Sequence, residues 1–111
     1  IQVNIDREPQ KAGVLPEETK ALARACAGLS GLRLRGLMCI PQIGSVSHDP
    51  ADSYLKMNRL YRQLLGEGLE LDTLSMGMSA DLEAAISNGS TMVRIGTDLL
   101  GPRPVAEEAA C

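Results

Sequence analysis

Aromatic residues are very scarce in this sequence, which has no tryptophan, no phenylalanine and only two tyrosines, Tyr54 and Tyr61. Basic residues are outnumbered by acidic ones, 11 against 14, and the formal net charge is −3. Proteins that bind nucleic acids stack bases on aromatic rings and neutralise phosphates with basic side chains. The shortage of both features argues against nucleic acid as a partner.

Residues that bind metals or form disulfides are also few. His48 is the one histidine, and Cys26, Cys39 and Cys111 include no Cys-x-x-Cys pair. A zinc site and a disulfide framework are therefore poorly supported, and unpaired cysteines are typical of a reducing cytoplasm. The sequence also has no apolar run close to the roughly 20 residues that span a bilayer. We expect a cytoplasmic protein with no membrane partner.

The composition that remains is that of a globular chain, with 44% hydrophobic and 23% charged residues among 111. This length fits one domain or part of one. The chain starts at Ile1, directly in strand-like sequence and without a signal-peptide pattern. We therefore expect it to be a piece of a longer polypeptide.

Hydrophobic periodicity predicts strands that alternate with helices. Apolar or alternating runs predict strands at 1–5, 34–40, 73–76 and 92–95. Apolar residues at helical spacing predict helices at 16–29, 50–65 and 79–88, with a short helical turn at 98–100. Pro16, Asp49 with Pro50, and Ser79 are suitable residues to start the three longer helices.

The alternation of strands and helices predicts an α/β fold with parallel strands and right-handed crossovers. Two architectures fit. One is an open, doubly wound sheet of four strands, and the other is half of a (β/α)8 TIM barrel, since a whole barrel takes about 250 residues. Four twisted strands with helices on one side leave the inner face of the sheet without a cover. We expect a second chain, either another copy or the missing half of a barrel, to bury it.

The carboxyl ends of the last two strands carry the most informative residues. Gly77-Met78-Ser79 and Gly96-Thr97 are small turns that expose backbone N–H groups, and Ser79 adds a hydroxyl at a predicted helix start. Gly77 has no Cβ and would let a ligand approach the backbone. Either turn alone reads as an ordinary connector, but two at neighbouring strand ends predict a phosphate site.

Polar residues on the strands raise a second question. Arg94 shares a strand face with Met92 and Gly96, opposite Val93 and Ile95, so its guanidinium points toward the inside of a barrel. It needs an acceptor there, either a ligand atom or a protein carboxylate, and the sequence leaves both open. Gln2 and Asn4 could likewise line a site or fill an interior layer.

No pattern predicts catalysis. His48 is expected to be a solvated residue beside a helix cap, and Lys11 a solvated loop lysine. Neither a nucleophile with its base nor a pair of carboxylates stands out.

Five segments, in order along the chain, resemble the C-terminal half of the pyridoxal phosphate homeostasis protein family. This family is a single-domain relative of the alanine racemase N-terminal barrel. The segments are Gln2-Val3-Asn4-Ile5, Lys11-Ala12-Gly13, Leu34-Arg35-Gly36-Leu37-Met38, Leu74-Ser75-Met76-Gly77-Met78-Ser79-Ala80-Asp81 and Met92-Val93-Arg94-Ile95-Gly96-Thr97. The resemblance covers residues 1–104, which we expect to form the barrel half, with 105–111 as a flexible tail.

The resemblance implies a (β/α)8 barrel of the fold-type III class that binds pyridoxal 5′-phosphate (PLP) and buffers or delivers it without catalysis. It implies that phosphate and ring are contacted by residues of the two turns and by the arginine: Gly77, Met78, Ser79, Arg94, Gly96 and Thr97. Two alternatives remain, a fold-type III enzyme such as an amino-acid racemase and a barrel fragment that binds only phosphate.

One family feature has no counterpart in this sequence. The family's Schiff-base lysine lies on the first barrel strand, outside the half that the chain resembles. The lysines here are Lys11, Lys20 and Lys56, and none of them matches that position. The resemblance thus implies that this chain supplies the phosphate-binding half, and that the missing N-terminal half supplies the lysine.

Overall fold

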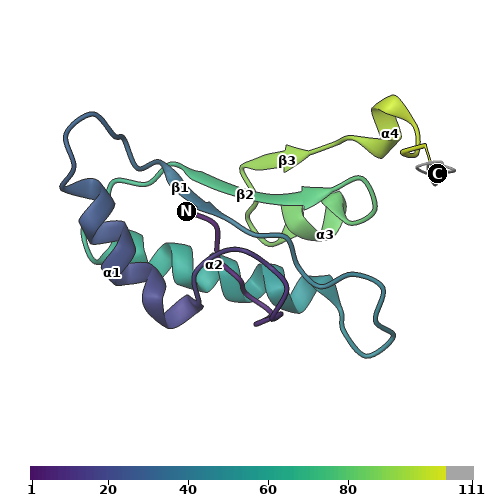
Figure 1. Cartoon of the computed structure of the whole chain (residues 1–111), viewed down its shortest axis with the longest axis horizontal. Coiled ribbons are helices and arrows are strands. Elements are labelled where there is room, and N and C mark those ends of the chain that lie inside the picture. Colours follow the sequence, from purple (N-terminus) through teal and green to yellow (C-terminus); the bar gives the residue numbers. More distant parts are fainter. Residues whose placement is uncertain (105–111) are drawn as a thin grey trace, which may run out of the picture.

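A computed structural model describes residues 1–104 of the chain (Figure 1). The predicted tail at 105–111 lies outside the described residues. Helices and strands alternate within the described part, as predicted. The elements are α1 (Pro16–Ala27), β1 (Gly36–Met38), α2 (Pro50–Gly66), β2 (Thr73–Met78), α3 (Leu82–Ser87), β3 (Met92–Arg94) and α4 (Thr97–Leu100).

The strands form one parallel sheet in the order β1-β2-β3, with β2 in the middle. Met38 of β1 pairs with Ser75 of β2, and Met78 of β2 pairs with Arg94 of β3. The register shifts between Ser75 and Met78, so β2 carries an irregularity just before its carboxyl end. The predicted parallel arrangement is confirmed for these three strands.

The first predicted strand, 1–5, forms only isolated parallel bridges, from Gln2 to Met38 and from Val3 to Val14. The chain turns away directly afterwards because the Asn4 side chain bonds the backbone of Glu8 twice, through Nδ2 to the carbonyl at 2.8 Å and through Oδ1 from the N–H at 3.0 Å. The segment still lies beside β1 in parallel, and its Val3 and Ile5 side chains are buried.

Two helices end or begin away from their predicted positions. Helix α1 ends at Ala27, where the Gly28 N–H bonds the Arg24 carbonyl at 3.2 Å and the Leu29 N–H bonds the Cys26 carbonyl at 3.1 Å. Helix α3 begins at Leu82 rather than at residue 79, since Met78 to Asp81 form a separate turn in which the Asp81 N–H bonds the Met78 carbonyl at 3.1 Å. Ser79 is therefore not the N-cap of a helix, and β2 extends through Gly77 to Met78.

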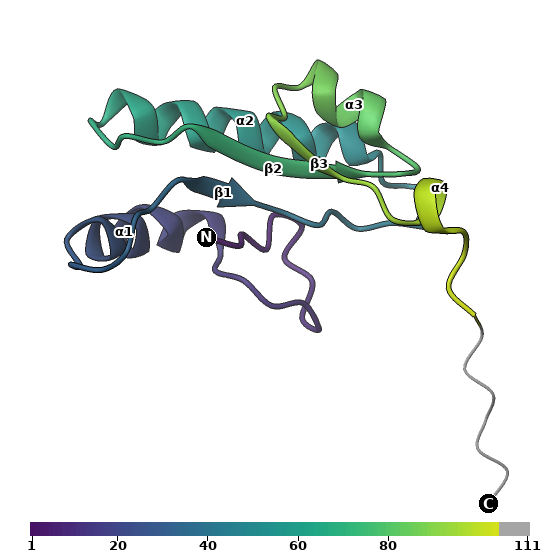
Figure 2. The ribbon, with the colours of Figure 1, turned by 90° about the horizontal axis from the view of Figure 1, so that it is seen from above.

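Helices α2 and α3 lie together on one side of β2, as Figure 2 shows, and the buried core fills the space between them and the sheet. Met57, Leu74 and Met76 have no exposed surface in this core. Strand β3 forms the other edge of the sheet, where several apolar side chains are exposed: Met78, Met92, Ile95, Leu99 and Leu100. Among residues 1–104, no helix is both long enough and apolar enough to cross a membrane.

Candidate functional site

The turn after β2 is held by its own residues and by α2. The Asp81 carboxylate accepts the Met78 N–H through Oδ1 at 2.9 Å and the Tyr54 hydroxyl through Oδ2 at 2.6 Å. Tyr54 projects from α2 and is completely buried. Burial and the bond to Asp81 raise the pKa of the Tyr54 hydroxyl, so it stays a donor at any ordinary pH. Ser79 is presented at a fixed place within this braced turn.

The turn after β3 meets the first turn directly. The backbone N–H of Asp98, in the first turn of α4, donates to Ser79 Oγ at 3.1 Å. The Ser79 hydroxyl uses a lone pair for this bond, so its own proton remains available to a ligand. The N–H groups of Gly96 and Thr97 precede the first bonds of α4, which run from Leu99 and Leu100 to the Gly96 carbonyl. The structure thus brings together the two predicted turns.

The two glycines of these turns serve different purposes. Gly77 has a φ of +104°, and a Cβ placed on it would lie 2.6 Å from the Ala85 Cβ of α3. Its missing side chain therefore lets α3 pack against β2, which corrects the expectation that it opens the backbone to a ligand. At Gly96 an added Cβ would meet no atom of the protein within 4 Å. The open space beside the backbone is thus at Gly96.

Arg94 crosses the face of the sheet away from α3, as strand alternation predicted. Its Nη1 donates to Ser75 Oγ of β2 at 2.6 Å, and its Nη2 donates to the Cys39 carbonyl beyond β1 at 2.9 Å. These acceptors are a neutral hydroxyl and a carbonyl rather than the carboxylate that was one of the two expected alternatives. A guanidinium carries five N–H donors, so Arg94 can still bond a further acceptor.

Acidic residues lie on another side of the Ser79 turn. A groove of about 640 Å³ is lined by Ser79 together with residues from the starts of three helices, including Asp49, Asp81, Glu83 and Asp98. Its carboxylates would repel an anion. A phosphate at Ser79 therefore has to bind outside this groove, toward the Gly96–Thr97 backbone. Helices α3 and α4 have only six and four residues, so individual N–H groups rather than a long-helix dipole would hold it.

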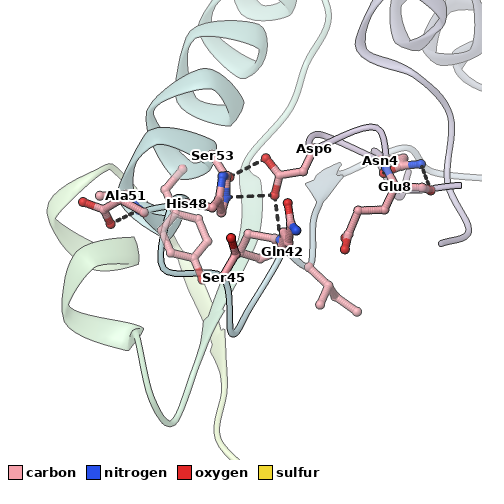
Figure 3. Close-up of polar contacts among 12 residues, drawn as sticks. Asn4, Asp6, Glu8, Gln42, Ser45, His48, Ala51 and Ser53 are labelled. Atoms are coloured by element: carbon pink, nitrogen blue, oxygen red, sulfur yellow. Dashed lines mark hydrogen bonds and ion pairs between the residues drawn. The ribbon is translucent and has the colours of Figure 1, made fainter. Parts of the chain in front are cut away.

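A second polar cluster lies where the first segment and β1 end (Figure 3). The Asp6 side chain, 5% exposed, accepts the Gln42 N–H at 2.7 Å and the Ser53 hydroxyl at 2.6 Å. His48 Nε2 lies 2.9 Å from Ser53 Oγ and 3.3 Å from Asp6 Oδ2. We call these four residues the Asp6 cluster. His48 is thus not the solvated loop residue that was expected.

The Asp6 cluster contains a serine, a histidine and an aspartate, but it is not arranged for nucleophilic catalysis. A catalytic serine gives its proton to histidine, whereas the Ser53 hydroxyl donates to Asp6 and has no exposed surface. The cluster instead joins the loop after residue 5, the loop after β1 and helix α2. Sequence reasoning missed it because Asp6 and Ser53 are 47 positions apart.

Lys11 also differs from the expected solvated residue. Its Nζ donates to the carbonyls of Ile40 and Pro41, both at 3.0 Å, and pairs with the Glu8 carboxylate at 2.6 Å. The ammonium thereby ties the first loop to the chain that leaves β1. Gln2 is half-buried, and Asn4 bonds its own loop at Glu8.

Neither of the described cysteines is placed as an obvious nucleophile. Cys39 is fully buried, and this burial raises the pKa of its thiol to about 12, so it stays protonated near neutral pH. Cys26 is half-buried on α1. Within residues 1–104, no group of three or more histidine, cysteine, aspartate or glutamate side chains could hold a metal ion.

Comparison with known families matches residues 1–104 to the family described as the alanine racemase N-terminal domain. The chain belongs to this family. The family resemblance that the sequence indicated over residues 1–104 is thereby confirmed.

Curated relatives of this chain are called pyridoxal phosphate homeostasis protein. The protein from Pseudomonas aeruginosa is 49% identical over 110 residues, which is 99% of this chain and 46% of the relative. The proteins from Vibrio cholerae and Escherichia coli K12 are 43% and 44% identical, again over 46% of their length. This chain therefore spans about half the length of the curated relatives that it matches.

Solved structures of PipY from Synechococcus elongatus share the fold. The structure without PLP is 32% identical with a TM-score of 0.81, and the alignment covers 91% of this chain and 48% of the PipY chain. The structure with PLP bound is 31% identical with a TM-score of 0.78 and aligns with 91% and 47%. This match decides between the two architectures left open by the sequence: the chain is part of a (β/α)8 barrel, not an open doubly wound sheet.

Proposed function

We propose that this chain provides the phosphate-binding half of a pyridoxal phosphate site in a protein that buffers or delivers the cofactor. The observation that carries the proposal is the hydrogen bond from the Asp98 N–H to Ser79 Oγ, which places the two small turns side by side. The homeostasis proteins among the relatives and the PipY structure with PLP bound identify the ligand class.

Three groups of this chain suit the cofactor phosphate. The Ser79 hydroxyl has a free proton, Gly96 and Thr97 offer backbone N–H groups and a hydroxyl, and the space beside Gly96 is open. Each hydrogen bond to a charged phosphate contributes about 1.5–3 kcal/mol. Gly77 and Met78 complete the proposed set by forming the strand end that carries Ser79, and Arg94 completes it with its remaining N–H groups beside the phosphate and ring.

A role without catalysis agrees with the polar side chains described here. Bound pyridoxal phosphate would supply an aldehyde and an electron-accepting ring. Two candidate nucleophiles among residues 1–104 are engaged elsewhere, since Ser53 donates to Asp6 and Cys39 is a buried, protonated thiol. The free thiols among residues 1–104 also suit a cytoplasmic location.

The proposed partner of this chain is the other half of the barrel. Strand β3 is an edge strand, and the apolar side chains of Met92, Ile95 and Leu99 are more than two-fifths exposed beside it, at 53%, 44% and 77%. An uncovered edge of this kind favours association with further strands. A second copy of the chain would be the alternative cover.

The test is calorimetric titration of pyridoxal phosphate into the complete barrel that carries this chain. Ser79→Ala, Thr97→Ala and Gly96→Val are each expected to weaken binding several-fold without unfolding the protein. Ser87→Ala, at the exposed end of α3, is the matched control and should change nothing. Unchanged affinity in all three variants would mean that the turns are only connectors.

The absorbance spectrum separates the proposed function from a site for phosphate alone. A protein that bonds the cofactor to a lysine absorbs in the visible range after it is mixed with pyridoxal phosphate. A phosphate-only barrel shows no such band, and inorganic phosphate then binds it as tightly as the cofactor does. An assay for racemisation of amino acids tests the enzymatic alternative, and turnover there would overturn the role without catalysis.

A further inference from the structure

Tyr54 places a hydroxyl group deep in the apolar core. Tyr54 has no exposed surface and belongs to the same buried cluster as Met57, Leu74 and Met76. A phenylalanine would fill this volume without the cost of burying a polar group. The hydroxyl is therefore present for its hydrogen bond to Asp81 Oδ2, a short contact of 2.6 Å.

Asp81 is used in an unusual way for a residue that precedes a helix. An aspartate at the N-cap ordinarily accepts the N–H groups of the helix that follows and stabilises it by about 1 kcal/mol. Asp81 makes no such bond to α3. Its two carboxylate oxygens bond backward instead, to the Met78 N–H at 2.9 Å and to Tyr54. The turn is braced at the expense of capping the helix.

The braced turn contains Ser79, and Ser79 in turn contacts α4. Hydrogen bonds therefore link Tyr54 through Asp81 to the Met78 N–H, the peptide bond leads from Met78 to Ser79, and the Ser79 hydroxyl accepts the Asp98 N–H. It links α2 to both turns of the candidate site. A buried tyrosine on a neighbouring helix thus fixes the position of a half-exposed serine.

We propose that Tyr54 is a positioning residue for the phosphate site, acting through Asp81 on the turn that presents Ser79. The proposal rests on the proposed function, and it adds two residues that do not contact the ligand. Their role is to hold the Ser79 hydroxyl beside the turn that carries Gly96 and Thr97, which it meets through the Asp98 N–H. Loss of the Tyr54 hydroxyl frees the Asp81 carboxylate to rotate toward the start of α3, and Ser79 then moves away from Asp98.

Tyr54→Phe is the direct test, because it removes the hydroxyl and keeps the ring. Tyr61→Phe is the matched control, since Tyr61 lies on the same helix and its hydroxyl bonds the Leu71 carbonyl at 3.3 Å, far from the two turns. Both variants are titrated in the complete barrel with pyridoxal phosphate and with pyridoxal, which lacks the phosphate. We expect Tyr54→Phe to weaken pyridoxal phosphate about fivefold and leave pyridoxal unchanged. Tyr61→Phe should alter neither.

This difference between the two ligands separates positioning from a structural role. A merely structural defect would weaken both ligands together or lower the melting temperature alone, and either result would overturn the proposal. A double-mutant cycle checks the route: in an Asp81→Ala background, Tyr54→Phe should cause no additional loss of affinity. A full additional fivefold loss in that background would overturn the route through Asp81.

Two further variants keep the test decisive. If Tyr54→Phe does not fold, Asp81→Asn is titrated in its place, and it should weaken pyridoxal phosphate while sparing pyridoxal. Ser79→Ala reports on the proposed function itself. If Ser79→Ala weakens pyridoxal phosphate but Tyr54→Phe does not, the positioning role is wrong and the phosphate site stands. If neither has an effect, both proposals are wrong.

Discussion

The first two strand ends of this chain and the last two are built in opposite ways. After residue 5 and after β1, buried or half-buried polar side chains bond each other and the backbone, with Asp6 accepting two hydrogen bonds and Lys11 donating two. After β2 and β3, the turns are joined by one bond from Asp98 to Ser79, and Gly96 and Thr97 are exposed. We call these regions the closed end and the open end.

The difference indicates where a ligand can bind. At the closed end the protein has used its own side chains to satisfy its polar groups, and a ligand would have to displace them. At the open end, the Ser79 hydroxyl proton and the backbone N–H groups of Gly96 and Thr97 are not used in the first hydrogen bonds of α4. Substitutions at the closed end should therefore change stability, and substitutions at the open end should change ligand affinity.

The largest effect is expected from Asp6→Ala at the closed end. The substitution leaves the Gln42 N–H and the buried Ser53 hydroxyl without their acceptor, which should lower the free energy of unfolding by about 4 kcal/mol. Urea unfolding of the complete barrel measures the change. Asp98→Ala is the counterpart at the open end, where the carboxylate is exposed, and it should cost less than about 0.5 kcal/mol. Equal losses in the two variants would contradict the division into two ends.

The two glycines of the candidate site divide it more finely. Gly77→Ala combines a positive φ with a Cβ only 2.6 Å from Ala85, and it should lower the free energy of unfolding by about 3 kcal/mol. Gly96→Ala meets no atom within 4 Å at a φ of −113°, so stability should hardly change. Thermal melting of both variants decides the point. A large loss at Gly96 would show that this turn is packed rather than open.

A smaller effect is expected from Lys11→Met. The variant keeps most of the apolar stem but removes the donor to the Ile40 and Pro41 carbonyls, and the partner of Glu8 is lost as well. We expect a loss of about 2 kcal/mol in urea unfolding. Lys56→Met on the exposed face of α2 is the control and should be nearly neutral. If both lysine variants behave alike, Lys11 is a surface residue after all.

The sequence was sufficient for the features that depend on local periodicity. Alternating strands and helices predicted the parallel sheet, and the period of two along β3 placed Arg94 on the face opposite Val93. The start of α3 was predicted incorrectly because both Ser79 and Asp81 can precede a helix. The contact of Asp81 with Tyr54, 27 positions away, selects the turn over a longer helix.

The contacts of the closed end could not be predicted either, because their partners also lie far apart in the sequence. Lys11 meets Ile40 across 29 positions, and Asp6 meets Ser53 across 47. Nothing within a few residues of Lys11 or His48 distinguishes it from a solvated side chain. Such pairs become visible only when the barrel topology brings the carboxyl ends of neighbouring strands together. The candidate site residues themselves lie on turns whose glycine and serine content is a local signal, so the sequence alone was enough to propose them.

The smallest effect concerns an exposed carboxylate just before the start of β2, which contrasts with buried Asp6. Arg35 bonds Asp72 twice, at 2.8 and 3.1 Å, and with Thr73 it lowers the pKa of the Asp72 carboxyl from 3.8 to about 2. Because the pKa is lower in the folded state, this pair stabilises the fold above about pH 4 and loses that effect as the pH falls toward 2. The contribution of this ion pair at neutral pH is small, since the side chains of Arg35 and Asp72 are 61% and 49% exposed.

NMR titration of the Asp72 carboxyl should show the low midpoint. Arg35→Gln should raise this midpoint toward 3.8 while hardly changing the urea midpoint at pH 7. A midpoint that is the same with and without Arg35 would show that the ion pair does not form in solution.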